Sequence, residues 1–295
     1  MQSENRCLNI ILQIIFICMA AACIFPLILV ISISFSDQEA IARFGYRLIP
    51  DKFSIDAYKY VLASGSGIGH AYLVTILSTV SGTFLSVLVI AMYAYPLSRE
   101  GLKYKGFFTF YIFFTMLFSG GLVAWYMVVT RVLCLGNTIW ALILPLTMSA
   151  WYVIIMRTFF QTSIPASLIE SARLDGAGAF TVLIKIVFPL ALPAVATIAL
   201  FQTLAYWNDW WNPMLLITDK NLYNLQFLLQ VMMKNIQMLS EESMSADAVT
   251  QIAENIPQES VRMALCVVAM GPILIVYPFF QKYFIQGLTI GAVKG

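Results

Sequence analysis

The chain has 295 residues, of which 60% are apolar and only 11% are charged. Soluble globular domains carry about 25% charged residues, so this composition excludes an ordinary soluble protein and predicts a chain that lies mostly in lipid. The net charge of +2 at neutral pH excludes a dedicated nucleic-acid binder, because neutralising several phosphates requires a strongly basic surface.

Six apolar runs are long enough to cross about 30 Å of hydrocarbon as helices. In chain order they cover residues 8–35, 71–97, 107–130, 138–156, 186–217 and 263–281. The fifth run would be about 48 Å long as one helix, so it must tilt, kink or break. Pro189 and Pro193 permit a bend near one end, and Pro213 can interrupt the other. The sequence therefore predicts an all-α, polytopic membrane protein in which residues 1–295 form a single transmembrane domain.

The distribution of positive charge predicts the orientation of these spans. Lysine and arginine are denser in residues 1–9, 99–105, 157–185 and 282–295 than in 35–69, 131–137 and 219–262. Because positively charged loops stay on the cytoplasmic side, both termini and the connection 157–185 are predicted to be cytoplasmic. The connections 36–69 and 219–262 then lie on the outer face, and the stretch 222–239 has the composition of an amphipathic helix there.

The connection 157–185 contains a short predicted helix. Ser163 followed by Pro165 is typical of a helix start, and Gly176 followed by Gly178 is typical of a helix end. The helix of about three turns between them is too short to span the membrane, and it predicts a projecting knob that enters a groove on another protein. An interfacial helix on the membrane is the alternative, although such helices ordinarily carry more basic residues than the single Arg173 present here.

Two consecutive segments at this point carry a family resemblance. Residues 170–177 read Glu-Ser-Ala-Arg-Leu-Asp-Gly-Ala, and residues 186–193 read Ile-Val-Phe-Pro-Leu-Ala-Leu-Pro. Together they resemble the signature loop of permease subunits of bacterial ABC importers, with Ser171 where that signature commonly has alanine. The segment 287–295 resembles the tail of the carbohydrate-importing branch, of the type of the smaller maltose-permease subunit. Three further segments (118–122, 137–142 and 155–160) resemble the subgroup associated with complex-polysaccharide oligosaccharides, such as aldouronate, pectin or alginate fragments.

This resemblance implies a type I ABC importer permease fold, with six transmembrane helices and a cytoplasmic coupling helix. It implies a second homologous permease subunit as partner and two cytoplasmic ATPase subunits that bind ATP, so no cofactor is expected in this chain. An extracellular solute-binding protein delivers the oligosaccharide, which crosses the bacterial cytoplasmic membrane by alternating access. The sequence agrees in that it contains no phosphate-binding G-x-x-x-x-G-K-[ST] loop.

Two sets of residues are expected to contact the ATPases. The first set lies on the signature helix and comprises Glu170, Ser171, Ala172, Asp175, Gly176 and Ala177. Its small side chains permit close approach, its carboxylates can pair with donors on the ATPase, and Gly176 can adopt the positive φ that ends a helix. The second set is implied by the resemblance of the tail and comprises Gly287, Thr289, Gly291 and Lys294. A disordered chain end is the alternative for the tail.

The run 206–213 is the most distinctive intramembrane feature, because three of the six tryptophans fall within five residues. Aromatic faces pack on sugar rings, and Asn and Asp side chains bind hydroxyl groups. The predicted substrate path therefore comprises Trp207, Asn208, Asp209, Trp210, Trp211 and Asn212. An interfacial aromatic belt is the alternative interpretation.

Two other functional classes fit less well. An ion-coupled secondary transporter of a small polar solute needs ionisable groups inside the membrane, and Asp209 is the only candidate. An enzyme needs a convergent set of acid, base, nucleophile or metal ligands, and neither H-E-x-x-H nor G-x-S-x-G occurs. The sequence thus favours a permease that is not an enzyme and has no metal site.

Overall fold

The computed structural model describes residues 6–63, 67–242, 259–274 and 278. In these residues the chain is helical, and its β-structure is limited to an isolated antiparallel bridge between Ser36 and Phe53. The chain divides into two compact units. The first comprises Met1–Ile68 with Leu229–Pro272, and the second comprises Gly69–Leu228 with Ile273–Gly295.

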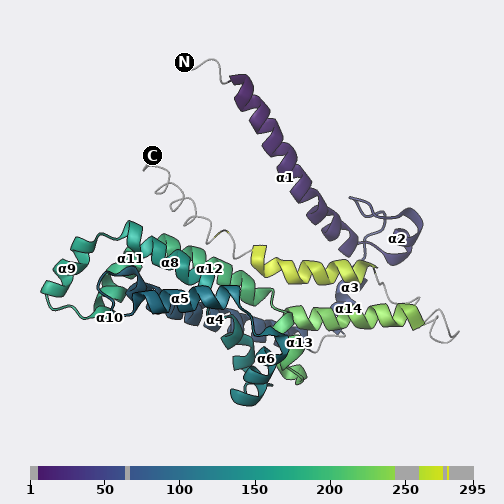
Figure 1. Ribbon diagram of the computed structural model, residues 1–295. Helices are drawn as coiled ribbons and strands as arrows, with labels where there is room; N and C mark the ends of the chain where they lie inside the picture. Colours follow the sequence, from purple (N-terminus) through teal and green to yellow (C-terminus); the bar gives the residue numbers. More distant parts are fainter. Residues whose placement is uncertain (1–5, 64–66, 243–258, 275–277, 279–295) are drawn as a thin grey trace. The chain divides into compact units, whose positions relative to one another are not determined.

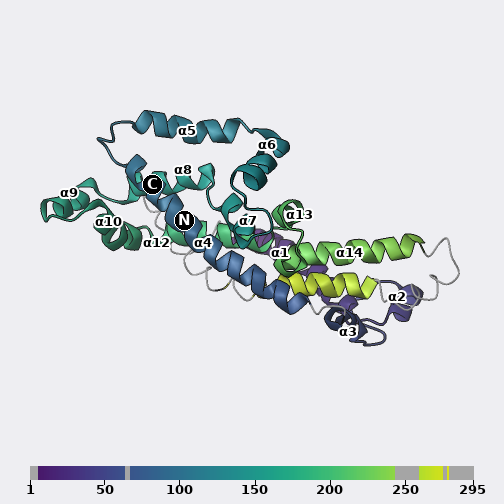
Figure 2. The ribbon, with the colours of Figure 1, turned by 90° about the horizontal axis from the view of Figure 1, so that it is seen from below.

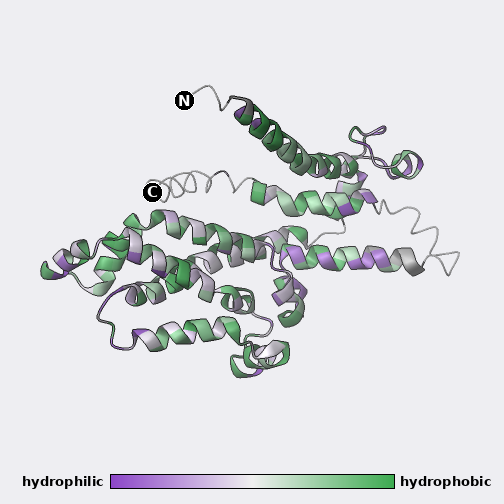
Figure 3. Cartoon of the chain, turned by 45° about the horizontal axis from the view of Figure 1, so that its top comes forward, coloured by the Kyte–Doolittle hydropathy of each residue, from purple (hydrophilic) through white to green (hydrophobic). Residues whose placement is uncertain are grey.

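The first unit contains α1 (Arg6–Ser34), α2 (Gln38–Phe44), α3 (Asp56–Ala63), most of α14 (Leu225–Glu242) and a helix over residues 259–274. Helix α1 is strongly apolar along its length (Figure 3), and its candidate span Leu8–Ser34 has no buried residue in its most apolar window. A helix with an apolar surface all round is suited to lipid or to another membrane helix rather than to water.

A small folded segment follows α1. The carboxylate of Asp37 accepts hydrogen bonds from the backbone N–H groups of Glu39 and Ala40, which satisfies free donors at the start of α2. The same carboxylate forms an ion pair with Lys52 at 3.0 Å. The ring of Phe35 stacks on that of Phe53 with centroids 5.4 Å apart. These contacts give part of the connection 36–69 a defined structure.

The second unit holds the remaining helices. They are α4 (Ile68–Ser98), α5 (Lys105–Leu117), α6 (Gly121–Met127), η1 (Val128–Val132), α7 (Ile139–Ile143), η2 (Leu144–Leu146), α8 (Ala150–Ser163), α9 (Ala166–Leu174), α10 (Ala179–Val182), η3 (Leu183–Val187), α11 (Phe188–Leu190), α12 (Leu192–Trp207), α13 (Trp211–Leu216) and η4 (Lys220–Leu222). Figures 1 and 2 show α9 and α10 at one end of this unit and α6, α7 and α13 at the other.

Three of the expected spans are bent pairs of helices. The bends measure 117° between Leu117 and Gly121, 52° between Leu146 and Ala150, and 86° between Leu190 and Leu192. With each pair counted as one span, the described part of the chain offers up to five candidate spans, and the sixth expected run is described only at 263–274 and at residue 278.

Local sequence explains two of these bends. Gly121 has a φ of +80°. Glycine adopts this conformation readily, whereas a residue with a β-carbon is strained in it. The 86° bend lies between Pro189 and Pro193, where the expected break of the long run occurs. The expected interruption near Pro213 is also present, because the chain leaves α12 at Asn208 and Pro213 lies in the first turn of α13, a position that proline tolerates.

The core of the second unit packs α4 against α8 and the helices that follow the connection 157–185. Its fully buried residues include Ile90 and Ala94 of α4, Met156 and Phe160 of α8, and Ile198 of α12. This cluster extends to the end of the unit where α9 lies. The core therefore provides a packed base for α9.

A buried hydroxyl connects α4, α7 and α12. The side chain of Tyr206 is 1% exposed, and its hydroxyl donates a hydrogen bond of 2.8 Å to the carbonyl of Ile143. Ser86 Oγ lies 3.1 Å from the same oxygen, and Thr147 Oγ1 lies 3.4 Å from it. Because lipid offers no hydrogen bonds, polar groups at membrane depth must find such partners within the protein.

Candidate functional site

Helix α9 occupies the position expected for the short helix of the connection 157–185. The expected start is confirmed to within one residue, since α9 begins at Ala166, directly after Pro165. Ser163 itself does not cap α9, because it is the last residue of α8. The expected end is confirmed, since Gly176 has a φ of +84°. The amide of Ala177 donates to the carbonyl of Ala172 at 2.9 Å and closes the last turn.

The two sides of α9 differ in burial. Ile169 is 3% exposed and belongs to the core of the second unit, where Ala172 and Ala177 pack partly buried beside it. In contrast, Leu174 is 89% exposed and Leu168 is 42% exposed. One side of the helix therefore anchors it to the membrane-spanning helices, and the other presents apolar side chains.

This burial divides the residues expected to contact the ATPases. Glu170, Ser171, Asp175 and Gly176 are exposed, whereas Ala172 and Ala177 are half-buried against the core. Sequence reasoning placed Leu168 on one side of the helix and missed two residues, Ile169 and Leu174. An available signal was the presence of three large apolar residues on a short helix that otherwise carries small and polar side chains.

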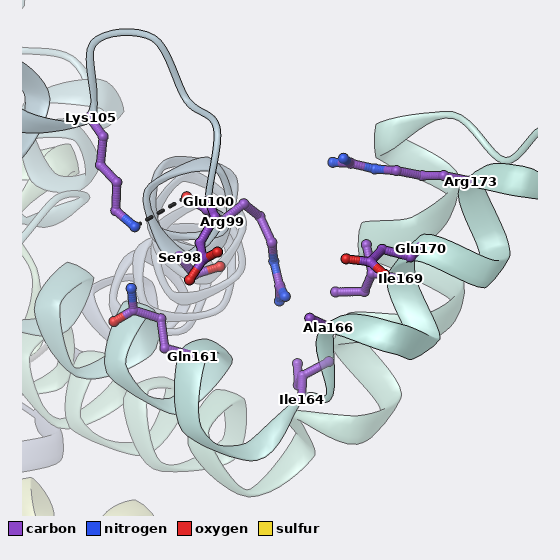
Figure 4. A pocket seen from close by; sticks show the side chains of 10 residues that line it. All are labelled: Ser98, Arg99, Glu100, Lys105, Gln161, Ile164, Ala166, Ile169, Glu170 and Arg173. Carbon is purple, nitrogen blue, oxygen red and sulfur yellow. Dashed lines mark hydrogen bonds between the residues drawn. The ribbon is translucent and has the colours of Figure 1, made fainter.

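A hollow of about 260 Å³ lies between α9, α8 and the link that follows α4 (Figure 4). It is lined by Ser98, Arg99, Glu100, Lys105, Gln161, Ile164, Ala166, Ile169, Glu170 and Arg173. Glu170 and Arg173 approach it from α9, and Arg99 approaches it from the opposite side. The hollow thus separates the signature helix from the end of α4.

The aromatic run 206–213 forms the end of α12, a short link and the start of α13. Trp207 is 6% exposed and its ring centroid lies 6.3 Å from that of Tyr72. Trp210 and Trp211 are 40% and 44% exposed, and their rings meet edge to face with centroids 5.5 Å apart. The structure therefore brings two tryptophans together at the surface and buries the third.

The polar residues of this run divide in the same way. Asp209 accepts hydrogen bonds from the backbone N–H of Asn212 at 3.1 Å and from its side-chain amide at 2.8 Å. Asn212 is 6% exposed, and the amide of Asn224 donates to the backbone carbonyl of Asp209. Only Asn208 is exposed among the three polar residues of the run. Asn208, Trp210 and Trp211 are thus exposed on this chain, whereas Asp209 and Asn212 shape the link.

Asn137 fixes the far end of α13. Its backbone N–H donates to the carbonyl of Leu216 at 3.0 Å, and its side-chain amide donates to Thr218 Oγ1 at 2.7 Å. Its side-chain oxygen accepts hydrogen bonds from the N–H groups of Thr218 at 2.6 Å and Asp219 at 3.0 Å. Sequence reasoning gave Asn137 no role, although it begins one of the segments that carry the resemblance.

Trp207 also lines an apolar groove of about 490 Å³ along α4 and α12, together with side chains such as Ile76 and Phe84. In the residues that the structure describes, no three His, Cys, Asp or Glu side chains are grouped as metal ligands would be. The tail residues Gly287, Thr289, Gly291 and Lys294 lie outside the described residues.

Comparison with known proteins gives one consistent result. Residues 2–290 match the family described as "Binding-protein-dependent transport system inner membrane component". The polygalacturonan/rhamnogalacturonan transport system permease protein YtcP of Bacillus subtilis (strain 168) is 38% identical over 99% of this chain and 100% of that protein. The arabinooligosaccharides transport system permease protein AraQ of Halalkalibacterium halodurans is 28% identical over 98% of this chain and 97% of that protein.

A solved structure gives the same result for the fold. It is a crystal structure of a bacterial ABC transporter involved in the import of the acidic polysaccharide alginate. One of its chains superposes with a TM-score of 0.82 at 29% identity, covering 96% of this chain and 99% of that one. This chain therefore belongs to the family of inner membrane components of binding-protein-dependent transport systems, and it has the type I ABC importer permease fold.

Proposed function

We propose that this chain is one permease subunit of an ATP-driven importer that brings an oligosaccharide, released from an acidic polysaccharide such as pectin or alginate, into a bacterial cell. The named substrates of the similar proteins support this substrate class, since polygalacturonan, rhamnogalacturonan and alginate all carry uronic acids. Family membership supports transport rather than catalysis and does not favour an ion-coupled secondary transporter.

The observation that carries the proposal is the two-sided burial of α9. A helix that passes force between proteins must hold to both of them in more than one state. Ile169 holds α9 to the core of the membrane-spanning helices, and the exposed Leu174 offers an apolar anchor for a groove on an ATPase. Two ATPase subunits, one on this chain and one on a second homologous permease, would then drive alternating access.

The remaining partners follow from the predicted orientation, with both termini in the cytoplasm. The extracellular binding protein docks on the outer connections 36–69 and 219–262 and releases the oligosaccharide into a path between the two permeases. Exposed Asn208, Trp210 and Trp211 contact the sugar rings and hydroxyl groups. The tail 287–295 contacts the ATPases and couples their state to that of the permease.

Uptake by the reconstituted complex tests this function. Proteoliposomes containing both permeases and both ATPases are supplied with the binding protein outside. They should import oligogalacturonides or alginate oligosaccharides only when ATP is enclosed in the vesicle lumen, on the side of the ATPases. Import that is independent of ATP but requires an imposed ion gradient would support a secondary transporter instead.

A paired substitution tests the role of α9. Leu174→Asp should reduce co-purification of the ATPases by about tenfold or more, since a buried anchor at an interface is typically worth at least 1.4 kcal/mol. Leu133→Asp is the matched control, because Leu133 is an exposed leucine at the opposite end of the same unit. Equal recovery of the ATPases with both variants would show that α9 is not part of the surface on which they dock.

A further inference from the structure

Three side chains form a contact between the ends of α4 and α8, which we call the Arg99 clamp. It consists of Tyr95, Arg99 and Phe160. The guanidinium carbon of Arg99 lies 5.3 Å from the ring centroid of Tyr95, and Arg99 Nη2 donates a long hydrogen bond of 3.4 Å to the carbonyl of Phe160. The rings of Tyr95 and Phe160 meet edge to face with centroids 6.4 Å apart.

The two aromatic residues of the clamp are buried, whereas Arg99 is half-buried and has no acidic partner near it. Tyr95 is 5% exposed and Phe160 is fully buried. Among residues 67–242, no carboxylate lies within ion-pair distance of Arg99, and its Nε is buried without a hydrogen-bond partner. The guanidinium of Arg99 is therefore stabilised by the ring face of Tyr95 and by the carbonyl of Phe160, both of which carry partial negative charge.

The carbonyl of Phe160 that accepts the hydrogen bond from Arg99 lies close to the start of α9. Phe160 lies in the last turn of α8, where backbone carbonyls have no partner within the helix and favour a positive charge. Helix α9 begins at Ala166, a few residues later. On the other side, Lys105 Nζ of α5 donates to the backbone carbonyl of Arg99 at 3.1 Å, so the clamp joins the ends of α4, α5 and α8.

Figure 4 shows Arg99 directed into the hollow whose opposite wall is α9. The hollow lies on the side of α9 that faces Arg99, so α9 is held to the unit by the packing of Ile169 and by its connection to α8. If the connection between α8 and α9 were flexible, α9 would move with the ATPase while α8 and α4 stayed in place. Holding the end of α8 rigid is thus a requirement for passing that movement on to α4.

We propose that Arg99 is a positioning residue that fixes the end of α8, and with it the angle of α9, so that displacement of α9 moves α4 and α8 together. The proposal rests on the proposed role of α9 as the joint with the ATPase. It assigns no contact between Arg99 and the ATPase or the sugar. The alternative is that Arg99 reaches a carboxylate on the ATPase directly.

The chain offers a matched set of variants. Arg99→Gln removes the charge, and Tyr95→Leu removes the ring on which the charge rests while leaving Arg99 in place. Tyr95→Phe is the control, because the hydroxyl of Tyr95 is buried without a hydrogen-bond partner and only the ring belongs to the clamp. Arg99→Lys keeps the charge without the planar group that stacks on the ring, and it covers the case in which Arg99→Gln fails to fold.

The readout is the number of oligosaccharides imported per ATP hydrolysed in proteoliposomes, measured beside ATPase co-purification. Loss of one cation–π contact lowers the population of the clamped state relative to the open state by about fivefold. We therefore expect Arg99→Gln and Tyr95→Leu to lower this ratio by up to that factor, and Arg99→Lys to lower it less. All four variants should retain both ATPases, and Tyr95→Phe should match the wild type. A purely structural defect would lower the yield of complex and leave the ratio unchanged in the complex that forms.

Two results would overturn the proposal. An unchanged ratio in Arg99→Gln and Tyr95→Leu would show that the clamp does not affect coupling. A lowered ratio or lost ATPase in Arg99→Gln, with wild-type behaviour in Tyr95→Leu, would make Arg99 a direct ATPase contact. Failure of the proposed function itself would be distinct, because the wild-type complex would then show no ATP-dependent import.

Discussion

The ring of Tyr206 lies directly against Gly82, so closely that a β-carbon at position 82 would come within 2.5 to 2.8 Å of three ring atoms. Real β-carbons essentially never make such contacts. Gly82 is therefore the position at which α4 accepts the aromatic residue that α12 inserts, and the hydroxyl of Tyr206 reaches past it to Ile143, Ser86 and Thr147.

Replacing Gly82 by alanine should destabilise the protein, because either the ring or one of the helices must shift. Overpacking of this kind costs about 1–3 kcal/mol. We expect a lower apparent melting temperature of the detergent-purified protein. Gly106→Ala in α5 is the control, since nothing lies within 4 Å of a β-carbon there. An equal melting temperature in both variants would show that Tyr206 can move aside.

Gly176→Val should uncouple the ATPases from transport, because Gly176 has a φ of +84° and a β-branched residue is strained in that conformation. The six spans should still insert, and the measurement is ATP hydrolysis stimulated by the loaded binding protein. Gly178→Val is the control, because Gly178 has a φ of −69° and open space around it. Equal stimulation in both variants would show that the end of α9 is not part of the joint.

Glu170→Lys tests the charge of the same helix. Glu170 is exposed and forms no ion pair within residues 67–242, so reversing its charge should spare the fold. If a basic group of the ATPase faces it, the substitution should weaken co-purification of the ATPases and more so at low ionic strength. Glu100→Lys, at an exposed position across the hollow, is the control.

The fold of the segment 36–55 should depend on pH through the ion pair of Asp37 with Lys52. The hydrogen bond from Lys52 lowers the pKa of Asp37, and the pair raises the pKa of Lys52. The stabilisation is therefore complete between about pH 4 and pH 10, the ordinary pKa values of the two groups. It is lost as the pH falls through the lowered pKa of Asp37 or rises through the raised pKa of Lys52.

Limited proteolysis within residues 38–55, with a protease active at both acidic and neutral pH, measures the effect. Asp37→Asn keeps a side chain that can cap α2 and removes the ion pair, so cleavage should be faster than in the wild type at pH 7. The difference should shrink as the pH falls through the lowered pKa of Asp37. A difference that does not shrink toward acidic pH would attribute the effect to something other than the pair.

The aromatic link makes a prediction that separates transport from stability. Trp211→Ala and Asn208→Ala should raise the KM for oligosaccharide uptake with little effect on melting temperature, because both side chains are exposed. Asn212→Ala should lower the melting temperature, since it removes the amide that donates to Asp209 at 2.8 Å. Normal uptake kinetics in the first two variants would favour an aromatic belt.

Much of the architecture was predictable, because lipid imposes long apolar runs and glycine and proline mark their interruptions. The end of α9 at Gly176 and the bend between Pro189 and Pro193 follow from local backbone chemistry. The start of α9 after Pro165 was predictable too, but the place of Ser163 in the last turn of α8 was not, because it depends on packing of α8 up to the buried Ile164.

The site was predictable only in outline. Periodicity cannot reveal that Asp209 and Asn212 satisfy each other, since that depends on the path of the link. Nor can it reveal that Arg99 meets Phe160, which lies 61 residues away along the chain. Contacts between distant segments determine which residues of a signature remain available to a partner.

The hydrogen bonds of Asn137 have a consequence for biosynthesis. Cys134 and Asn137 both adopt positive φ without being glycines, a conformation that is strained unless something holds it. What holds Asn137 is the segment 216–219, which is synthesised about 80 residues later, or roughly 4 to 16 seconds at 5–20 residues per second. Until then the backbone and side-chain amides of Asn137 must find other hydrogen-bond partners, so this corner of the permease acquires its final form only after residues 216–219 have been synthesised.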